Sequence, residues 1–297
     1  AEDGGRGDGG GPADAGTRDT GVADDDAGVA DGGSDAMADV DGGPLPDSWF
    51  PLYVPEGPAV TLSGVGSNSS GVTYNTRTNT LFVIRNNAAI VHELGLDYAL
   101  LRTIQLRNPP GSTDTEDILY MGEVGGQSEF AIVTERGTAA VGIIPDGVTS
   151  VEVRGWQILT YAGAPPVSNK GGEGIAYDPA TNRFWVCMEE SPMRIYQFER
   201  PVGDGDYRDG MVVTEPFDAE AVLGSSIRDM ASCLFDARTG RLAILSERSD
   251  RIVDVTLTGS IVEVVDVDGA PQYEGITLHA DAMWLVSEPN MIRRYDL

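Results

Sequence analysis

The chain has 297 residues, and its 47 acidic side chains outnumber its 20 basic ones, which gives a formal net charge of −27 at pH 7. A surface this acidic disfavours nucleic acid polymers and anionic membranes as partners, because both carry negative charge. No run of residues is long and apolar enough to predict a transmembrane helix.

Residues 1–46 consist mostly of Gly, Ala and Asp, with almost no large apolar side chain. Twelve acidic residues against two arginines give this segment a net charge of −10, and it cannot bury enough surface to offset its ordering entropy. We therefore expect a disordered acidic linker. Such a linker before a β-rich domain suggests a periplasmic, extracellular or cell-surface protein, tethered by a lipid upstream. A cytoplasmic protein with a solubilising tail is the alternative.

Residues 47–297 are enough for one domain, and they contain five copies of one pattern, a strand, a turn and a second strand. The copies are "SGVTYNTRTNTLFVIRNN" from Ser70, "TEDILYMGEVGGQSEFAIVTERG" from Thr115, "GEGIAYDPATNRFWVCMEES" from Gly172, "ASCLFDARTGRLAILSERSD" from Ala231 and "YEGITLHADAMWLVSEPN" from Tyr273. A third strand follows each pair. Fourth strands are expected at residues 100–106, 148–155, 211–217 and 261–267, and none follows the last copy.

These copies predict an all-β domain, a five-bladed β-propeller of four-stranded antiparallel blades. The matching positions Ser70, Glu116, Glu173, Ser232 and Glu274 are separated by 46, 57, 59 and 42 residues. The two longer repeats leave room for further strands, so six blades are the alternative. The segment from Leu52 to Leu62 belongs to no copy. We expect it to complete the last blade, which closes the ring and covers an exposed strand edge.

The first strand of each propeller blade lines the central channel, so the five matching residues should converge on one axis. Three carboxylates at close range repel one another unless a cation lies between them. Carboxylate and hydroxyl oxygens are the ligands that Ca²⁺ prefers, whereas the two histidines have no partner suited to zinc. We therefore predict a Ca²⁺ site formed by Ser70, Glu116, Glu173, Ser232 and Glu274. A water-filled channel without an ion is the alternative.

The second strand of each pair returns the chain to the same mouth of the channel. Its last residues should form a polar rim, for which the candidates are Arg85, Asn86, Glu135, Arg136, Glu189, Glu247, Arg248 and Glu288. A rim of this composition could bind a small polar ligand or a protein partner. Alternatively, its Glu and Arg side chains pair between adjacent blades and hold the ring together. We expect a monomer.

Cys187 and Cys233 lie in the apolar runs "RFWVCMEE" and "MASCLFD". So sparse a pair is not a disulfide framework. Two buried thiols are expected, and one bridge between neighbouring sheets is the alternative.

The motifs "SGVTYNTRTNTLFVI", "DTEDILYM", "KGGEGIAYDPATNRFWV" and "YEGITLHADAMWLVSEPN" resemble those of the SdiA-regulated (YjiK-like) family of exported bacterial propellers. The resemblance covers roughly residues 51–297. It implies a propeller fold but no particular activity.

The order Ser, Glu, Glu, Ser, Glu around the axis also resembles that of the calcium-activated nucleotidases (apyrases), five-bladed propellers with one central Ca²⁺. This resemblance implies the same five ligands, and "YEGI" is the closest local match. It also supplies an alternative function, a Ca²⁺-dependent nucleotide or phosphoester hydrolase. In that case Arg85, Arg136 and Arg248 would hold phosphate and a rim glutamate would act as the base. The chain departs from those enzymes in having a single lysine, Lys170.

Overall fold

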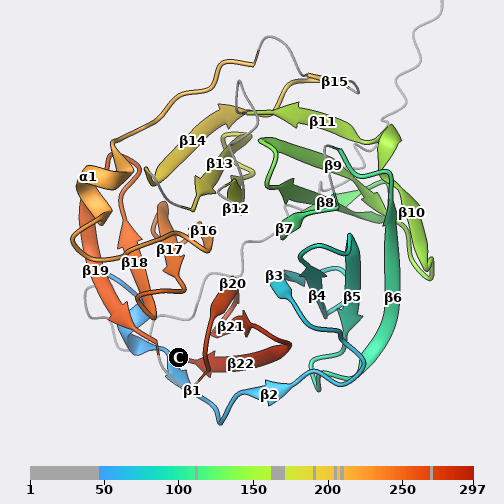
Figure 1. Cartoon of the computed structure of the whole chain (residues 1–297), viewed down its shortest axis with the longest axis horizontal. Coiled ribbons are helices and arrows are strands. Elements are labelled where there is room, and N and C mark those ends of the chain that lie inside the picture. Colours follow the sequence, from blue (N-terminus) through green and yellow to red (C-terminus); the bar gives the residue numbers. More distant parts are fainter. Residues whose placement is uncertain are drawn as a thin grey trace, which may run out of the picture. The chain divides into compact units, whose positions relative to one another are not determined.

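The computed structural model describes residues 47–110, 113–161, 171–189, 192–203, 206–207, 211–267 and 270–297. Five sheets form a ring around a central axis, which confirms the predicted five-bladed β-propeller (Figure 1). The predicted linker over residues 1–46 and Lys170 lie outside the described residues. Within the described part, no helix is long and apolar enough to cross a membrane.

Each blade is built from strands that follow one another along the chain, with the first strand nearest the axis (Figure 1). Blade 1 contains β3 (Ser69–Asn75), β4 (Thr80–Arg85), β5 (Ile90–Leu94) and β6 (Leu100–Arg107). Blade 2 contains β7 (Thr115–Val124), β8 (Gln127–Thr134), β9 (Thr138–Ile144) and β11 (Gln157–Thr160). Blade 3 contains β12 (Gly172–Asp178), β13 (Arg183–Met188) and β14 (Arg194–Glu199). Blade 4 contains β16 (Ser232–Asp236), β17 (Arg241–Ser246), β18 (Arg251–Val255) and β19 (Ile261–Asp266). Blade 5 contains β20 (Tyr273–His279), β21 (Ala282–Ser287) and β22 (Met291–Asp296).

Three of the inner hairpins share one turn chemistry. A side-chain oxygen at the end of the first strand accepts the backbone N–H two residues further on, at 3.0, 2.9 and 3.0 Å from Asn75, Asp178 and Asp236. The turns end on residues with a positive φ, which are Asn79, Asn182 and Gly240 at 57°, 54° and 67°. Asn and Gly tolerate this conformation, so the recurring turn motif has a direct backbone cause.

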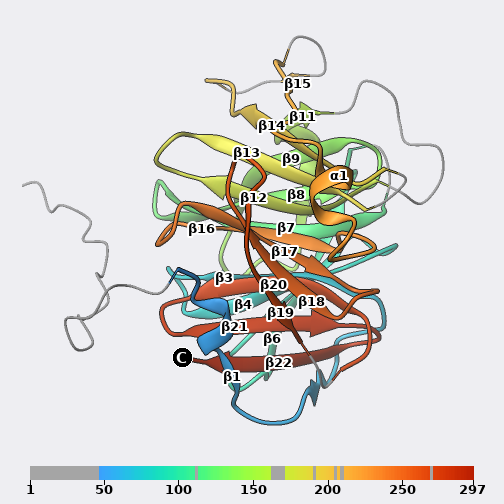
Figure 2. The same ribbon diagram turned by 90° about the vertical axis from the view of Figure 1, so that its left-hand side faces the viewer.

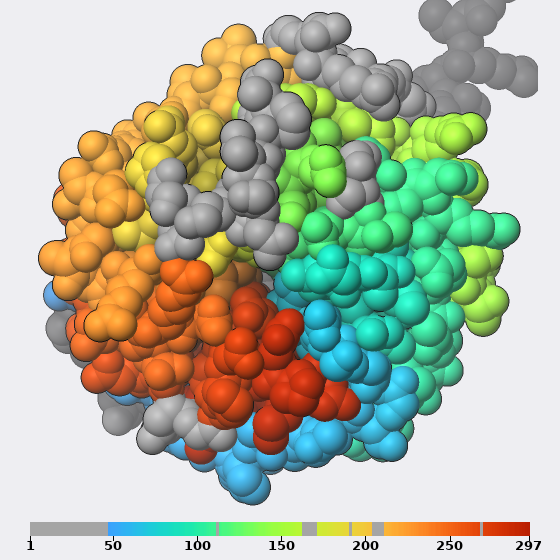
Figure 3. Space-filling view, viewed as in Figure 1, coloured from blue at the N-terminus to red at the C-terminus, as the bar shows by residue number. Residues whose placement is uncertain are grey.

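The N-terminal segment completes the last blade, as predicted. The two-residue strands β1 (Val54–Pro55) and β2 (Val60–Thr61) both pair antiparallel with β22. In Figure 2 the blue N-terminal segment runs beside β22, and in Figure 3 the red surface of blade 5 meets the blue and cyan surface that follows it. The otherwise open edge of β22 is therefore covered, which protects it from pairing with another chain.

The core consists of five apolar clusters, one at each junction between blades. Alternate residues of one strand enter different clusters. Phe82 and Ile84 face blade 2, whereas Leu81 and Val83 face blade 5. Because both faces of a blade are buried, its inner strands read as continuous apolar runs rather than as an alternating pattern.

Two predicted fourth strands differ in the structure. Within residues 148–155, β10 (Ser150–Glu152) pairs parallel with β6 of blade 1, and the 3₁₀ helix η2 (Val153–Gly155) follows it. Blade 2 instead takes β11 as its fourth strand and β15 (Asp206–Tyr207) beyond it. Within residues 211–217, one bridge joins Thr214 to Gln197, with hydrogen bonds of 2.7 and 2.9 Å. The next bonding position of that ladder is Pro216, which has no N–H to donate.

Two more helices of the described part pack against outer strands of the ring, one against β19 and one against β14. They are the 3₁₀ helix η1 (Phe50–Leu52) and the α-helix α1 (Ala219–Leu223). The carboxylate of Asp218 caps α1 by accepting the N–H of Ala221 at 3.0 Å. Both cysteines are buried free thiols, as expected in the simpler interpretation.

Candidate functional site

Four of the five residues predicted to line the axis stand at irregularities of the inner strands. In β3, β7, β12 and β20 the pairing with the second strand slips by one residue near the start of the strand, as in a β-bulge. The extra residues are Ser70, Glu116, Glu173 and Glu274. A bulge takes a residue out of the ladder and re-aims its side chain, so it can present a carboxylate outside the apolar clusters on both faces of the blade.

In blade 4 the residues are shifted by one position against the predicted alignment. Its inner strand begins in regular pairing, with Ser232 opposite Leu245, the next-to-last residue of the second strand. In blades 3 and 5 that register position belongs to Gly174 and Gly275. Ser232 therefore stands one position later than the prediction placed it. The residue before it, Ala231, takes the bulged position, because its N–H also donates to the Leu245 oxygen, at 2.9 Å.

The inner strands approach one another closely below the bulges. A Cβ on Gly71 would lie 2.2 Å from Oδ1 of Asp117, and one on Gly174 would lie 2.4 Å from the backbone N of Cys233. Neither position could carry a larger side chain without a shift of the neighbouring strand. The glycines that follow the axial residues are thus a packing requirement of the channel.

Asp117 joins three blades at this level. Its carboxylate accepts the N–H of Ile118 at 2.8 Å, the N–H of Ile175 at 3.1 Å and the hydroxyl of Ser232 at 3.2 Å. Burial raises the pKa of Asp117 to about 8, against the lowering effect of these hydrogen bonds. The hydroxyl of Ser232, predicted as a metal ligand, is directed to this carboxylate.

Above Asp117, three carboxyl groups of blade 2 form the group that we call the carboxylate cluster. One oxygen each from Asp114, Glu116 and Glu135 lies within 4.8 Å of the other two. Glu116 is 2% exposed, its Oε2 accepts the hydroxyl of Ser70 at 3.2 Å, and its Oε1 is buried without a hydrogen-bond partner. Among the described residues, this is the one group of three acidic, histidine or cysteine side chains close enough to hold a metal ion.

The electrostatics of the cluster favour protons or a cation. Burial, followed by the charges of Asp114 and Glu135, raises the pKa of Glu116 to about 8. Burial and a hydrogen bond with Asp114 raise the pKa of Glu135 to about 7. Because Glu116 is buried, its carboxylate gains more from a bound cation than an exposed one would.

Glu173 and Glu274 belong to the same mouth. Burial raises the pKa of Glu173 well above its ordinary value, and the charges of Glu116, Glu189, Glu135 and Glu274 raise it further. Burial, followed by the charge of Glu247 and then of three more acids, raises the pKa of Glu274 to about 9. The three predicted axial glutamates are thus close enough for the charge of one to raise the pKa of another. Of the five predicted ligands, only Glu116 belongs to the cluster, and metal contact by the other four remains a prediction.

The predicted rim residues are not equivalent to one another. Glu135, Glu189, Glu247 and Glu288 each contribute charge to the pKa of an axial glutamate. Arg248 forms an ion pair with Glu189 at 3.2 Å. This pair joins blades 3 and 4, as expected if the Glu and Arg side chains of the rim hold adjacent blades together.

The remaining rim candidates lie differently. Arg85 donates to the backbone oxygen of Ser67 at 2.8 Å, and Asn86 has a buried Oδ1 without a hydrogen-bond partner. Arg136 is exposed, and its charge lowers the pKa of Glu135. The rim is therefore predominantly acidic around the axis.

Three acidic residues of this region are missing from the prediction. They are Asp114, Asp117 and Asp229, the last of which is buried and accepts the hydroxyl of Ser246 and the N–H of Arg248. The sequence signal for Asp117 was present, because "EDI" stands where blades 3 and 5 have "EGI". Asp114 and Asp229 precede their strands, and the repeat pattern does not include them.

Comparison with known proteins identifies the family and the fold. A family model described as SdiA-regulated matches residues 47–296. Among solved structures, the chain is similar to a luciferin-regenerating enzyme, with 13% identity, 81% of this chain and 96% of that chain covered and a TM-score of 0.51. A structure described as the calcium-binding protein regucalcin from Agrobacterium tumefaciens shares 10% identity, with 80% and 92% covered and a TM-score of 0.48. At these identities the likeness concerns the fold alone.

Proposed function

The chain belongs to the SdiA-regulated family, and we propose that it is an exported or surface-tethered propeller that binds Ca²⁺ at one mouth of its channel. A small polar ligand or a protein partner would be received at the same mouth. The observation that carries the proposal is the carboxylate cluster, in which the buried Oε1 of Glu116 has no hydrogen-bond partner.

The spacing of the cluster suits one hard cation. Oxygen atoms bound to Ca²⁺ lie about 2.3–2.6 Å from it, so two of them can be at most about 5 Å apart. The oxygens of Asp114, Glu116 and Glu135 meet that condition. A cation would supply Glu116 Oε1 with the partner that it lacks and would relieve the repulsion among the three groups.

The donor set favours Ca²⁺ over a transition metal. The cluster offers carboxylate oxygens only, and backbone carbonyls and water can complete the six to eight ligands that Ca²⁺ accepts. The imidazoles are used elsewhere, because His92 contacts the hydroxyl of Thr103 at 3.1 Å and His279 stacks on Tyr74 at 4.1 Å. Neither could join Glu116 in a zinc site.

Export is consistent with a cation site of this kind. Extracellular Ca²⁺ modules commonly bind with dissociation constants of about 0.1–1 mM, which would leave such a site empty in the cytoplasm. The acidic composition of residues 1–46 suits a solvated spacer between a surface anchor and the propeller.

Calorimetric titration with Ca²⁺ tests the proposal. We expect one Ca²⁺ per chain and a higher melting temperature, because a ligand at 100 times its dissociation constant stabilises the folded state by about 2.7 kcal/mol. Glu116→Gln should abolish both effects. Glu123→Gln is the matched control, because Glu123 lies on the same strand, β7, but is exposed.

Two outcomes would contradict the proposal. One is a wild-type protein that neither binds Ca²⁺ at several millimolar nor responds to a chelator. The other is equal Ca²⁺ binding by Glu116→Gln and the control. A parallel assay of nucleotide hydrolysis with and without Ca²⁺ addresses the hydrolase alternative, since turnover that Glu116→Gln removes would make the site catalytic.

A further inference from the structure

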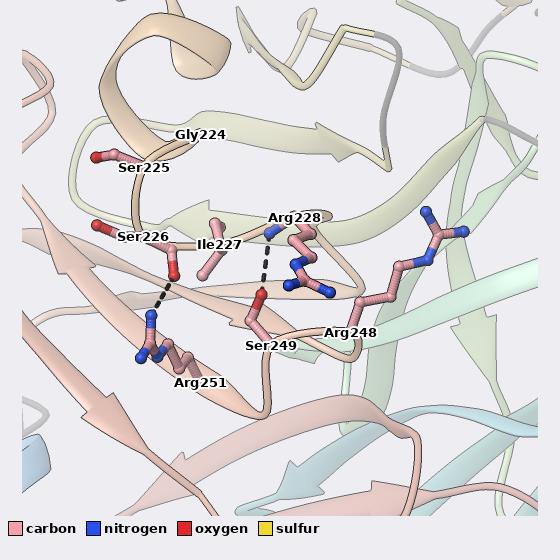
Figure 4. Close-up of a pocket in the computed structure, with 8 residues that line it drawn as sticks. All are labelled: Gly224, Ser225, Ser226, Ile227, Arg228, Arg248, Ser249 and Arg251. Atoms are coloured by element: carbon pink, nitrogen blue, oxygen red, sulfur yellow. Dashed lines mark hydrogen bonds between the residues drawn. The ribbon is translucent and has the colours of Figure 1, made fainter.

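A cavity of about 350 Å³ lies beside the mouth, between the loop that follows α1 and the turn that joins β17 to β18 (Figure 4). Three arginines line it, Arg228, Arg248 and Arg251, together with three serines and no acidic residue. The chain has 47 acidic and only 20 basic side chains, so three arginines around one cavity are a marked local reversal of charge.

The backbone around the cavity is fixed by the core and by hydrogen bonds. Ile227 is buried in the cluster between blades 3 and 4, and its N–H donates to the Leu223 oxygen at 3.0 Å. The N–H of Arg228 donates to Oγ of Ser249 at 3.0 Å, which ties the loop to the turn (Figure 4). The cavity therefore has a formed wall rather than depending on a rearrangement of the loop.

Two of the three guanidinium groups are balanced by carboxylates. Arg251 donates through Nε to Asp266 at 2.8 Å and through Nη1 to the backbone oxygen of Ser226 at 2.8 Å. Arg248 pairs with Glu189. For Arg228 the described residues supply no carboxylate partner. Asp229, the next residue, does not compensate it, because its carboxylate is buried against Ser246 and the backbone of Arg248.

The polar groups of the cavity that the hydrogen bonds and ion pairs above do not use are hydrogen-bond donors. The guanidinium of Arg228 offers a planar set of N–H groups, and Arg251 keeps N–H groups beyond the two that it uses. Ser249 accepts the amide of Arg228, so its hydroxyl hydrogen remains to be donated. Donors on one loop and one facing turn, with a net positive charge, are complementary to an oxyanion.

We propose that this cavity binds a tetrahedral oxyanion, the phosphate of a small phosphomonoester. A phosphate carries about −1.5 to −2 charges at neutral pH and three acceptor oxygens. It therefore matches several donors around a cation that has no carboxylate partner among the described residues better than a carboxylate does. The cavity is within the range of about 300–1,000 Å³ for small-molecule sites, so it has room for an organic group beyond the phosphate.

The cavity adjoins the cation site through one ion pair. Arg248 lines the cavity and pairs with Glu189, whose charge raises the pKa of both Glu116 and Glu173. The inference rests on the proposed function only for the idea that this mouth receives a ligand. Anion binding in a chelator and Ca²⁺ binding without phosphate are separate measurements, so either can fail while the other holds.

The test is calorimetric titration with inorganic phosphate, phenyl phosphate and acetate, at low ionic strength and in a chelator. We expect phosphate and phenyl phosphate to bind at least several-fold more tightly than acetate. Arg228→Ala should weaken phosphate binding at least tenfold. Arg154→Ala, which removes another exposed arginine on η2, should leave it unchanged. Arg228→Lys keeps the charge but not the planar donor set, and it should show an intermediate loss.

We do not expect a loss of phosphate binding in these variants to come from a loss of folding. No described ion pair involves Arg228, so Arg228→Ala should melt close to the wild type. Absence of phosphate binding to the wild-type protein at 10 mM, or equal binding by Arg228→Ala, would overturn the proposal. Equal affinity for acetate would overturn the assignment of a tetrahedral anion.

Discussion

Replacing Glu116 with Gln should change how the stability of the Ca²⁺-free protein depends on pH. The pKa of Glu116 is raised from 4.5 to about 8 in the folded protein. The folded state therefore holds a proton that the unfolded state releases, and stability must fall as the pH rises between these two values. The slope for one such group is about −1.4 kcal/mol per pH unit.

The size of the effect follows from that interval. Across it, ionisation of Glu116 alone would remove up to about 5 kcal/mol of unfolding free energy, and less if Glu135 and Glu173 share the protons. Gln resembles the protonated carboxyl group and does not titrate. We expect Glu116→Gln to match the wild type near pH 5 and to exceed it by several kcal/mol near pH 9.

Urea unfolding at pH 5, 7 and 9 in a chelator measures this difference, with Glu123→Gln as the control for the loss of one charge. Saturating Ca²⁺ should restore the unfolding free energy of the wild-type protein at pH 9, because the cation takes the place of the protons. It should leave the unfolding free energy of Glu116→Gln unchanged. Parallel pH curves for the wild type and Glu116→Gln would show that Glu116 is ionised at little cost in the folded state. The electrostatic argument for a cation would then be lost.

The remaining predictions concern the ring. Deletion through Leu62 should expose the edge of β22 and cause aggregation or a large loss of stability, whereas deletion through Pro46 should change melting little; a stable monomer from the longer deletion would contradict closure by this segment. Asp117→Ala should cost several kcal/mol, because it leaves buried donors from two other blades unpaired at about 1–3 kcal/mol each, and an unfolding free energy within 1 kcal/mol of the wild type would be inconsistent with this. Cys187 and Cys233 should react with a thiol reagent only after unfolding, so rapid labelling of the native protein would show that they are accessible.

The fold could be predicted from the sequence because each repeated hairpin is formed by residues that are close together in the chain. Each inner hairpin is encoded within about 20 residues, and in three of the five it has Asp or Asn at its start and Asn or Gly at its end, so the five copies predict five blades directly. The partner of an outer strand is not local. Residues 148–155 follow blade 2 in the chain, but β10 pairs with β6 of blade 1, because the free edge that it meets belongs to that blade.

The axial residues were predictable only as far as the repeats were aligned correctly. Alignment of "SC" with "EG" placed Ser232 among the axial ligands, although alignment of the turns that start at Asp178 and Asp236 would have shifted it by one residue. Ser232 lies in regular pairing, and its hydroxyl contacts Asp117. Contacts between blades, such as those of Asp117 with β12 and β16, depend on ring geometry that no single repeat encodes.

The bulges also explain how a propeller with buried blade faces can hold acids on its axis. A regular strand residue here points into one of two apolar clusters, where a charge would be costly. The side chain of a bulged residue need not enter either apolar cluster, and in blades 2, 3 and 5 the bulged residues are Glu116, Glu173 and Glu274. Blade 4 has Ala231 at its bulged position and contributes no axial glutamate, and the three arginines of the cavity lie in or just before this blade. Blade 4 also places the acids Asp229 and Glu247 close to Glu274, so its arginines add positive charge beside an otherwise acidic mouth. Such a surface is complementary to a cation and an anion bound side by side, which is the arrangement that a metal-bound phosphate would present.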